Sequence, residues 1–482
     1  MMHLLSRKRP LASAMLPGPT PRFSTPGLGD ARPAPAETAS GARGPGRLRP
    51  SPARPQSPAS SPFRGLWRAA ALVVLASGLA MGCSETAGPP PEGEAVKVRI
   101  WHQKDAAERA FLENWAEAYN ARQDSVELEV LYKETEELRN HFLFASIGGK
   151  GPDMVYGPAD NIGMLAITET IRPLDSLLTP EAKAAFIDEG LLRYEGRLYG
   201  VADQVGNHLT LVYNKDLVDT PPETFEEMLE IARANTLDED GDGSKERYGL
   251  VWNYTEPFFF IPFLTAYDGW VMNDAEEPTL DSPATVEAID FIKRLRDVEG
   301  VIPPTVDYNT AETLFKEGRA AMIINGPWAW AGYGDSGIDY GLAPIPYNEA
   351  SGAWARPMAA AKAYSLNPAV PDWKLPTVLG VMALLTGDEV QADMTRELAT
   401  IPVRKAVRAS GVMEANPILQ QSLAQLEHTR PMPTSPTLRL IWDGMRGPYQ
   451  LVMNGEVSGE EGARLMQSEV EKRLNDFALQ DR

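Results

Sequence analysis

Strand-like and helix-like patterns alternate through most of the chain, and this alternation constrains the fold more than any other feature. Side chains that alternate between apolar and polar predict strands, and apolar side chains repeated on one helical face predict helices. The first expected elements are strands at 96–101, 126–132 and 153–157, with helices at 111–119 and 134–147. Strands and helices in this succession predict an α/β fold built on βαβ units.

The same alternation returns further along the chain. The expected elements there are strands at 209–214, 248–253 and 320–325, with helices at 224–234, near 255–267 and at 284–298. Two α/β units with a cleft between them place ligand-binding groups on the loops at the carboxyl ends of strands. Residues 325–328, Asn-Gly-Pro-Trp, follow a buried strand and are predicted to form one such loop.

Length and charge narrow the possible functions. A chain of 482 residues is too long for one ordinary core and predicts two or three domains. Residues 1–82 carry eleven Lys and Arg and two acids, which leaves 35 basic and 64 acidic residues in the remainder, a net charge of −29. Because so acidic a surface repels phosphate backbones, nucleic acid is not expected as a partner.

The first residues read as an extension and an export signal. Residues 1–62 are rich in proline, arginine, serine and glycine without an apolar period, so we expect them to be disordered, and a start site assigned too far upstream would explain them. Residues 63–82 are predicted to be a signal peptide, because Arg64 and Arg68 precede an apolar run that is too short to span a membrane.

Cys83, the one cysteine of the chain, follows that apolar run directly. A single cysteine excludes an internal disulfide and a cysteine-based metal site. Its position resembles that of the lipidated cysteine of bacterial lipoproteins, although Ala80 stands where that pattern has leucine. An ordinary cleaved signal with an incidental cysteine is the alternative. Either way the protein is expected to be exported, with residues 83–95 as a flexible tether.

No catalytic signature is present. The chain has no GxSxG, HExxH or P-loop motif, and its five histidines do not stand at metal-ligand spacing. The sequence therefore predicts a protein that is not an enzyme. A glycoside hydrolase stays open as an alternative, because it needs only two carboxylates.

Seven segments in a fixed order carry a family resemblance. They are GPDMVYGPAD (151–160), YEGRLYGV (194–201), LVYNKDL (211–217), TEPFFFIP (255–262), LFKEGRAAMIINGPWAW (314–330), YGLAPIP (340–346) and MPTSPTLRLIW (432–442). From about residue 96 to its end, the chain resembles the solute-binding components of ABC sugar importers, among them the maltose/maltodextrin-binding proteins. The resemblance implies the periplasmic-binding-protein fold: two α/β lobes joined by crossing hinge strands, with a ligand cleft between them.

The resemblance also implies an organisation and a function. It assigns 96–203 plus 358–412 to the N-terminal lobe and 206–354 plus 415–482 to the C-terminal lobe. It implies a monomeric, lipid-anchored receptor in the periplasm or on the cell surface. The receptor would capture a di- or oligosaccharide of the maltose or maltodextrin kind by hinge closure and deliver it to the transmembrane subunits of an ABC permease.

Two tryptophans are the expected sugar platforms. In the family, the first tryptophan of the NGPWAW segment stacks on a sugar ring, and the resemblance assigns that role to Trp328. Trp442 matches a second stacking tryptophan, for which core packing is the alternative, and Met432 matches a contact beside it. Trp330 has no such role in the family, so we expect it to pack in the core.

Polar candidates accompany the two rings. Asp160 and Glu256 match family carboxylates that accept hydrogen bonds from sugar hydroxyls. The alternative for Asp160 is a helix N-cap, and the alternative for Glu256 is a solvent-exposed helix start. Gln103 and Lys104, at the end of the first expected strand, are further candidates.

Several positions depart from the maltodextrin-binding pattern, so the resemblance predicts a carbohydrate more firmly than maltose itself. Gly157 replaces an aromatic residue and Asn161 replaces an arginine. Asn207 stands near a family glutamate, where Asp203 is a candidate substitute, and Phe258 keeps the ring of a tyrosine but loses its hydroxyl. Each lost polar partner changes which hydroxyl pattern is accepted, because an unpaired buried polar group costs about 1–3 kcal/mol.

An acidic loop offers a candidate metal site. The segment LDEDGDGSKERYG (237–249) follows the first half of a calcium-binding loop, but Gly249 stands where the bidentate glutamate is usual. The candidate ligands are Asp238, Asp240, Asp242, Ser244 and Glu246. Similar segments occur in the family that the chain resembles, some of them binding calcium. A structural Ca²⁺ and a merely solvated acidic loop are both open, and no other cofactor is expected.

Three other functions stay open. A receptor of the same fold could bind a non-sugar solute, but a phosphate ligand would need convergent basic groups, and the candidate site offers mainly Lys104. A glycoside hydrolase would use Glu256 and Asp160 and would release reducing ends. A calcium-dependent structural protein of the surface would bind no small molecule.

Overall fold

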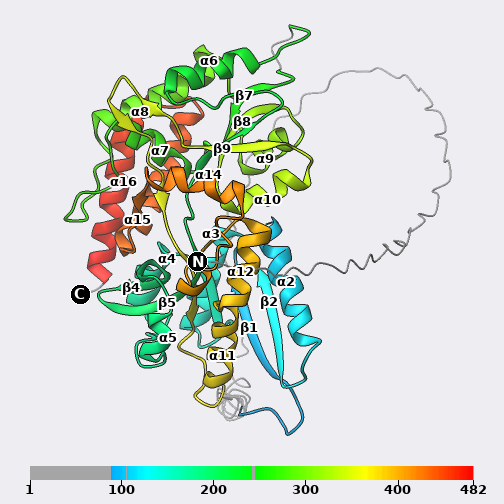
Figure 1. Cartoon of the computed structure of the whole chain (residues 1–482). Coiled ribbons are helices and arrows are strands. Elements are labelled where there is room, and N and C mark those ends of the chain that lie inside the picture. Colours follow the sequence, from blue (N-terminus) through cyan, green and yellow to red (C-terminus); the bar gives the residue numbers. More distant parts are fainter. Residues whose placement is uncertain (1–87, 105, 242–244, 481–482) are drawn as a thin grey trace, which may run out of the picture. The chain divides into compact units, whose positions relative to one another are not determined.

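The predicted alternation of strands and helices is confirmed in the computed structural model, which describes residues 88–104, 106–241 and 245–480 (Figure 1). The first elements are β1 (Val96–His102), α2 (Ala106–Asn120), β2 (Val126–Tyr132), α3 (Thr135–Ile147) and β3 (Met154–Pro158). Strand β1 pairs in parallel with both β2 and β3. Helices α2 and α3 are therefore the crossover connections that parallel strands need.

A seven-stranded sheet forms what we call the first lobe. Its order is β14-β5-β13-β3-β1-β2, with β4 paired to β5. The strands added to the first three are β4 (Leu191–Tyr194), β5 (Arg197–Val205), β13 (Lys362–Leu366) and β14 (Ile401–Pro402). Strand β13 lies antiparallel between β3 and β5, so a segment from far along the chain completes the middle of this sheet.

The helices of the first lobe begin and end as follows. After α2 and α3 come α4 (Asn161–Ile167), α5 (Pro180–Ala184), the 3₁₀-helix η1 (Asp188–Gly190), α11 (Leu375–Leu385), α12 (Asp388–Leu398) and α13 (Lys405–Arg408). Figure 1 shows α2, α11 and α12 beside the strands of this sheet.

A four-stranded sheet of order β7-β8-β6-β9 forms the second lobe. Its strands are β6 (Thr210–Asn214), β7 (Tyr248–Val251), β8 (Ala320–Asn325) and β9 (Tyr340–Ala343). Strand β8, which the sequence predicts to be buried, is buried at all six positions. The surrounding helices are α6 (Phe225–Asn235), α7 (Pro257–Ala266), α8 (Pro283–Lys293), the π-helix η2 (Arg294–Val298), α9 (Tyr308–Lys316), α10 (Pro327–Asp335) and α14 (Pro417–Leu426).

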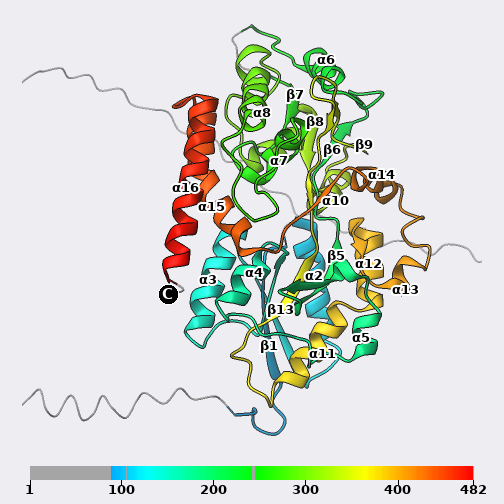
Figure 2. The same cartoon turned by 90° about the vertical axis from the view of Figure 1, so that its left-hand side faces the viewer.

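Two long helices close the chain. Helices α15 (Pro436–Met453) and α16 (Gly459–Gln480) pack side by side along one flank (Figure 2). Helix α15 also contacts α7 of the second lobe and α4 of the first. It therefore carries side chains to the place where the two lobes meet.

Short paired segments connect the lobes. The hairpin strands β10 (Tyr347–Asn348) and β11 (Ala353–Trp354) precede β12 (Met358–Ala359), which pairs in parallel with β15 (Arg430–Pro431). Strand β12 leads into β13 of the first lobe, and the chain returns to the second lobe between α13 and α14. A third connection runs from β5 to β6. The residue boundaries given for the two lobes from sequence stay a prediction.

One local prediction is wrong. Residues 325–328 do not form a loop that carries Trp328, because α10 begins at Pro327 with Gly326 as its N-cap, so Trp328 lies in the first helical turn. Proline favours the first position of a helix, since its fixed φ suits the helix and its missing N–H is not needed there. The connection after β8 is therefore a single glycine, and the tryptophan is held by regular structure.

Several predictions fall outside the described residues. The disordered extension (1–62), the signal peptide (63–82), Cys83 and the first part of the tether belong to residues 1–87. Within the described part of the chain, no helix is both long enough and apolar enough to cross a membrane.

Candidate ligand-binding site

A cavity of about 380 Å³ lies where the two lobes meet. Eight of the ten predicted ligand-binding residues line it: Gln103, Asp160, Asn207, Glu256, Phe258, Trp328, Met432 and Trp442. The other lining residues are Tyr132, Glu134, Thr135, Glu136, Pro158, Asn161, Asn253, Phe259, Tyr308, Asn309, Lys362, Arg439 and Arg446. Both lobes contribute, so a ligand here contacts two bodies at once.

Trp328 presents a half-buried ring to the cavity. Its indole N–H donates to the Tyr308 hydroxyl at 2.9 Å, and the Phe258 ring lies 6.4 Å away, centroid to centroid. A Cβ on Gly326 would lie 2.1 Å from the Trp328 ring, so only glycine permits the ring to lie back over the helix start. Trp330, two residues on, is fully buried, as predicted.

Trp442 and Met432 form a second apolar part of the cavity wall. Trp442 lies in α15, and Met432 follows β15 directly. Both are more than nine-tenths buried, but both border the cavity. Trp442 therefore packs in the core and also borders the cavity, so the two roles considered for it are compatible.

Three buried acceptor atoms of the cavity residues have no hydrogen-bond partner among the described residues. They are Gln103 Oε1, Asp160 Oδ1 and Asn207 Oδ1. Each side chain follows a strand of the first lobe: β1, β3 or β5. Because a buried unpaired acceptor is costly, this arrangement suits a ligand with several hydroxyl donors.

Asp160 stands at the N-cap position of α4, but its side chain makes no capping hydrogen bond. Burial raises the pKa of its carboxyl to about 6, against the lowering effect of the nearby Arg139 guanidinium. The capping role considered from sequence is thus not the one that the side chain performs. The carboxylate instead borders the cavity, with Arg439 Nη1 at 3.8 Å.

Gly157 and Asn161, two departures from the family pattern, are linked in space. A Cβ added to Gly157 would lie 2.9 Å from Asn161 Nδ2 and 3.4 Å from Gln103 Oε1. The amides of Asn161 and Gln103 therefore occupy the space that an aromatic side chain at 157 would need. The lost stacking surface is replaced by hydrogen-bonding groups.

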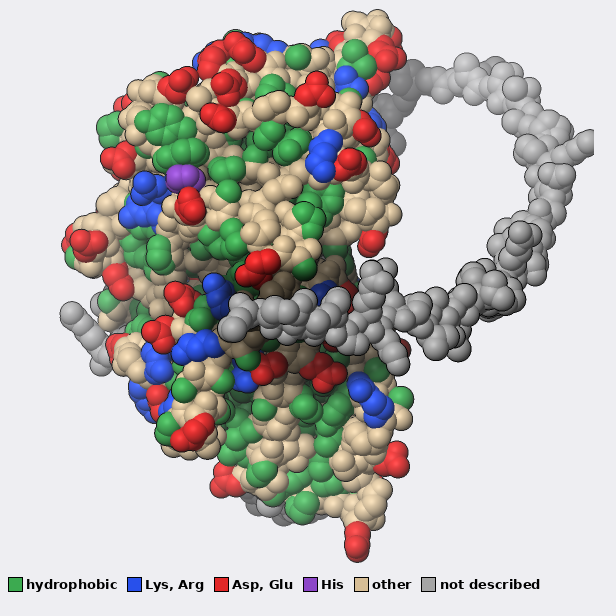
Figure 3. Space-filling view, viewed as in Figure 1, with side chains coloured by type: hydrophobic (Ala, Val, Ile, Leu, Met, Phe, Trp, Pro, Cys, Tyr) green, Lys and Arg blue, Asp and Glu red, His purple; other side chains and the backbone are tan. Residues whose placement is uncertain are grey.

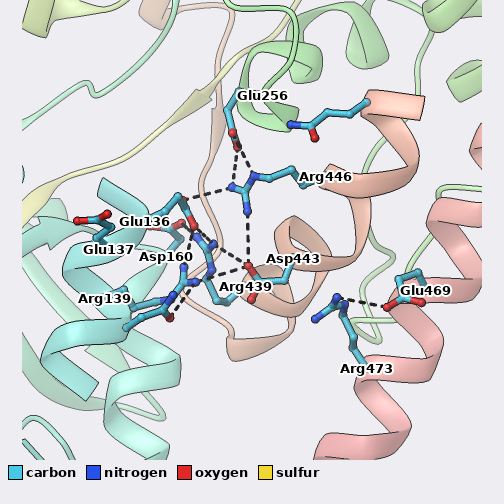
Figure 4. Close-up of polar contacts among 12 residues, drawn as sticks. Glu136, Glu137, Arg139, Asp160, Glu256, Arg439, Asp443, Arg446, Glu469 and Arg473 are labelled. Carbon is cyan, nitrogen blue, oxygen red and sulfur yellow. Dashed lines mark hydrogen bonds and ion pairs between the residues drawn. The ribbon is translucent and has the colours of Figure 1, made fainter. Parts of the chain in front are cut away.

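Ion pairs that join both lobes lie at the cavity wall, and Figure 4 shows them as one linked group. We call this the cavity ion-pair cluster; its members are Glu136, Arg139, Asp160, Glu256, Arg439, Asp443 and Arg446. Glu136 of α3 in the first lobe pairs with Arg439 at 2.5 Å and with Arg446 at 3.3 Å, both on α15. The cluster therefore bridges the lobes.

Glu256 is not a solvent-exposed helix start. It is the N-cap residue of α7 without a capping bond, and its two oxygens accept from Arg446 Nη2 at 2.9 Å and Nε at 3.2 Å. Burial raises the pKa of Glu256, while the Arg446 guanidinium acts to lower it. The paired groups offer both acceptors and donors to the edge of a sugar ring.

Lys104 and Asp203 do not line the cavity. Lys104 Nζ donates to Asp203 Oδ2 at 2.8 Å, and both side chains are almost fully buried. They belong to what we call the buried network of the first lobe, whose members are Lys104, Glu108, Tyr156, Asp203, Gln204 and Lys362. Asp203 therefore does not replace the family glutamate in the cavity; Asn207 remains there.

Sequence reasoning missed the basic residues of the cavity. Arg439 and Arg446 stand at helical spacing on the same face of α15 as Trp442, and that periodicity was an available signal. Lys362 interrupts an apolar strand, and a charge within such a run is also a recognisable signal. Tyr308, the partner of the Trp328 indole, has no signal that distinguishes it from other helix-start residues.

The acidic loop is only partly described. Asp242 and Ser244 lie outside the described residues, and Asp238 pairs with Lys245 at 2.8 Å. Glu246 accepts from the Glu239 backbone N–H at 2.7 Å. Within the described ranges, no three His, Cys, Asp or Glu side chains gather to hold a metal ion. Calcium binding by this loop stays a prediction.

The comparisons with known proteins agree with this geometry. Residues 114–421 match the family model described as bacterial extracellular solute-binding protein. The maltotriose-binding protein of Pyrococcus abyssi is 29% identical over 366 residues, which cover 74% of this chain and 77% of the relative. The maltooligosaccharide ABC transporter solute-binding lipoprotein of Streptococcus pneumoniae is 24% identical over 411 residues, which cover 81% and 92%.

A solved structure is similar over the same region. The maltose/maltodextrin-binding domain of Bdellovibrio bacteriovorus bound to maltotriose is 36% identical, with a TM-score of 0.77. The match covers 79% of this chain and 100% of that domain. The two-lobed α/β fold predicted from the sequence is thereby confirmed.

Proposed function

Because the chain belongs to the bacterial extracellular solute-binding protein family, we propose that it is the receptor of an ABC sugar importer and captures a malto-oligosaccharide such as maltotriose. The relatives and the solved structure named above bind such sugars or are named for them. The same relatives are binding proteins, so we propose capture without chemical conversion.

The lining of the cavity supports this proposal from the chain's own residues. Two tryptophans, Trp328 and Trp442, border the same cavity as three buried acceptors without partners. A pyranose presents C–H groups on its face and hydroxyls around its edge, so it satisfies both kinds of surface together. A ligand without hydrogen-bond donors would leave the acceptors of Gln103, Asp160 and Asn207 unpaired.

Hinge closure and export complete the proposal. Since the cavity is lined from both lobes, contacts to both favour the closed arrangement by the difference in ligand affinity between the two states. We further propose that the mature chain is a monomer held to the membrane by a lipid on Cys83 and delivers its sugar to permease subunits. The word lipoprotein in the name of the Streptococcus pneumoniae relative supports this part.

Calorimetry with maltotriose tests the proposal. We expect wild-type protein to bind, and Trp328→Ala and Trp442→Ala each to weaken binding by about 2 kcal/mol or more, as central aromatic contacts do. Trp373→Ala is the matched control, since Trp373 is partly exposed and does not line the cavity. Normal binding by both cavity variants would show that the site is wrong. Release of reducing ends would show a hydrolase instead.

A further inference from the structure

Lys362 links the buried network to the cavity. It is the first residue of β13, its side chain is 9% exposed, and it borders the cavity. Its Nζ lies 3.2 Å from both carboxylate oxygens of Glu108. Lys362 is not among the residues that the family resemblance predicts to bind the ligand, so we infer its role from its contacts.

Glu108 is a fixed anchor for this ammonium. It lies on α2 with a side chain 2% exposed, and it also accepts from Gln204 Nε2 at 2.9 Å. Burial alone would raise the pKa of Glu108, but the Lys362 and Lys104 ammonium groups and the Gln204 amide hold it below its usual value. The carboxylate therefore stays charged and keeps Lys362 in place.

The other side of the Lys362 ammonium faces the second lobe. Its Nζ lies 5.3 Å from the centroid of the Trp328 ring, within the range of a cation–π contact. Trp328 is held from its own lobe by Tyr308, so the ring is fixed on two sides. Of the cavity's two tryptophans, this one has a cation from the opposite lobe beside it.

A comparison with Lys104 separates a structural role from a ligand role. Both lysines pair with a buried carboxylate of the first lobe, but Lys104 makes one short contact of 2.8 Å and does not border the cavity. Lys362 makes two longer contacts to one carboxylate and does border it. An ammonium has three N–H donors, so two directed at Glu108 leave the third.

We propose that Lys362 is a ligand-binding residue: anchored on Glu108, its ammonium donates a hydrogen bond to a hydroxyl at the edge of the sugar unit stacked on Trp328. That unit is then tied to the first lobe by a charged donor and to the second lobe by an aromatic face. The inference rests on the proposed function, since it assigns a contact within that sugar site.

The test compares two neutralised lysine–glutamate pairs by calorimetry with maltotriose. The pair Glu108→Gln with Lys362→Met removes the cation without leaving a buried carboxylate unpaired. The control pair, Glu312→Gln with Lys316→Met, removes a lysine–glutamate contact on α9, where Lys316 pairs with Glu312 and lies 5.7 Å from the Tyr333 ring centroid, although this contact is more exposed. Neither control residue borders the cavity.

We expect the Lys362 pair to weaken maltotriose binding roughly 10- to 100-fold, as loss of a charged hydrogen bond does, and the control pair to bind as wild type. In a Trp328→Ala background the Lys362 effect should shrink, because both act on one sugar unit. Lys362→Arg, which keeps the charge and the donors, should restore most of the affinity.

Unchanged affinity in the folded Lys362 pair, with wild type binding normally, overturns this inference alone. Absence of maltotriose binding by wild type overturns the proposed function and the inference together. If the double variant does not fold, Glu108→Gln decides: it releases the ammonium from its anchor, so affinity should fall several-fold, and wild-type affinity in that variant overturns the inference.

Discussion

The buried network and the cavity ion-pair cluster both hold charges beside the cavity, but they differ in burial and in the origin of their partners. The network draws every member from the first lobe, and its Lys104–Asp203 pair is at most 3% exposed. The cluster joins both lobes, and Glu136 and Arg446 are 36% and 24% exposed. In the cluster, Arg439 and Arg446 each contact more than one carboxylate. In the network, Lys104 pairs with Asp203 and Lys362 pairs with Glu108.

This difference in burial indicates different roles for the two groups of charges. Removing one partner of a buried pair strands a charge, so the network fixes the shape of the first lobe beside the cavity. Partly exposed pairs cost little to break and can exchange a partner for a ligand hydroxyl. Figure 3 shows acidic and basic side chains intermixed over one outer face of the molecule. The cluster differs from such surface charges because it lies at the cavity and joins the two lobes.

Asp203→Ala should break the network with the largest effect on stability. It leaves Lys104 buried without its partner and removes the acceptor of the Tyr156 hydroxyl, so we expect a loss of about 3–5 kcal/mol of unfolding free energy. Chemical denaturation of the ligand-free protein measures it. Glu136→Ala, in the cluster, should lose no more than about 1 kcal/mol in the same experiment. Equal losses would contradict the contrast.

Asp160→Asn should have an intermediate effect that depends on pH. An acid with a pKa of about 6 when folded binds its proton more tightly than in the unfolded chain, so its favourable contribution is full below pH 4 and is lost as pH rises to 6. At pH 7.5 the ligand-free asparagine variant should therefore be more stable by about 1–3 kcal/mol, and near pH 4 the difference should vanish.

Melting temperatures of wild type and variant across pH measure this stability difference. Calorimetry measures the effect of the same substitution on maltotriose binding. Although more stable, Asp160→Asn should bind maltotriose less tightly, since an ionised acceptor is lost. Wild-type affinity should fall as pH drops below 6 and the carboxylate takes up a proton. A variant whose stability follows wild type at every pH would show that Asp160 titrates normally.

Glu136→Gln should have the smallest effect, and salt should remove it. Glu136 is 36% exposed and its partner Arg446 is 24% exposed. Its partner Arg439 is only 5% exposed but keeps a second carboxylate, Asp443, at 2.8 Å. We therefore expect a change in unfolding free energy below about 1 kcal/mol that shrinks in about 1 M NaCl, where the Debye length is near 3 Å. Denaturation at low and high salt measures it. Asp203→Ala serves as the control, because its buried pair should show little salt dependence.

Local patterns determined a large part of this molecule. Periodicity predicted β1, α3, β8 and their neighbours to within a few residues, because a strand or an amphipathic helix is written in consecutive side chains. The family segments also predicted that Trp328, Trp442, Asp160 and Glu256 belong to one site, and all four line one cavity. Asp160 and Trp328 follow strand ends and Glu256 precedes α7, whereas Trp442 lies within α15.

Tertiary structure alone decided which polar groups meet. Gln103 and Lys104 are adjacent in the sequence and directly follow β1, yet their side chains have different surroundings. Lys104 is buried in an ion pair with Asp203, whereas Gln103 borders the cavity. Lys362 reaches Glu108, 254 residues away, because β13 inserts between β3 and β5. Strand order and burial set these pairings, and both arise from packing between distant segments rather than from local sequence.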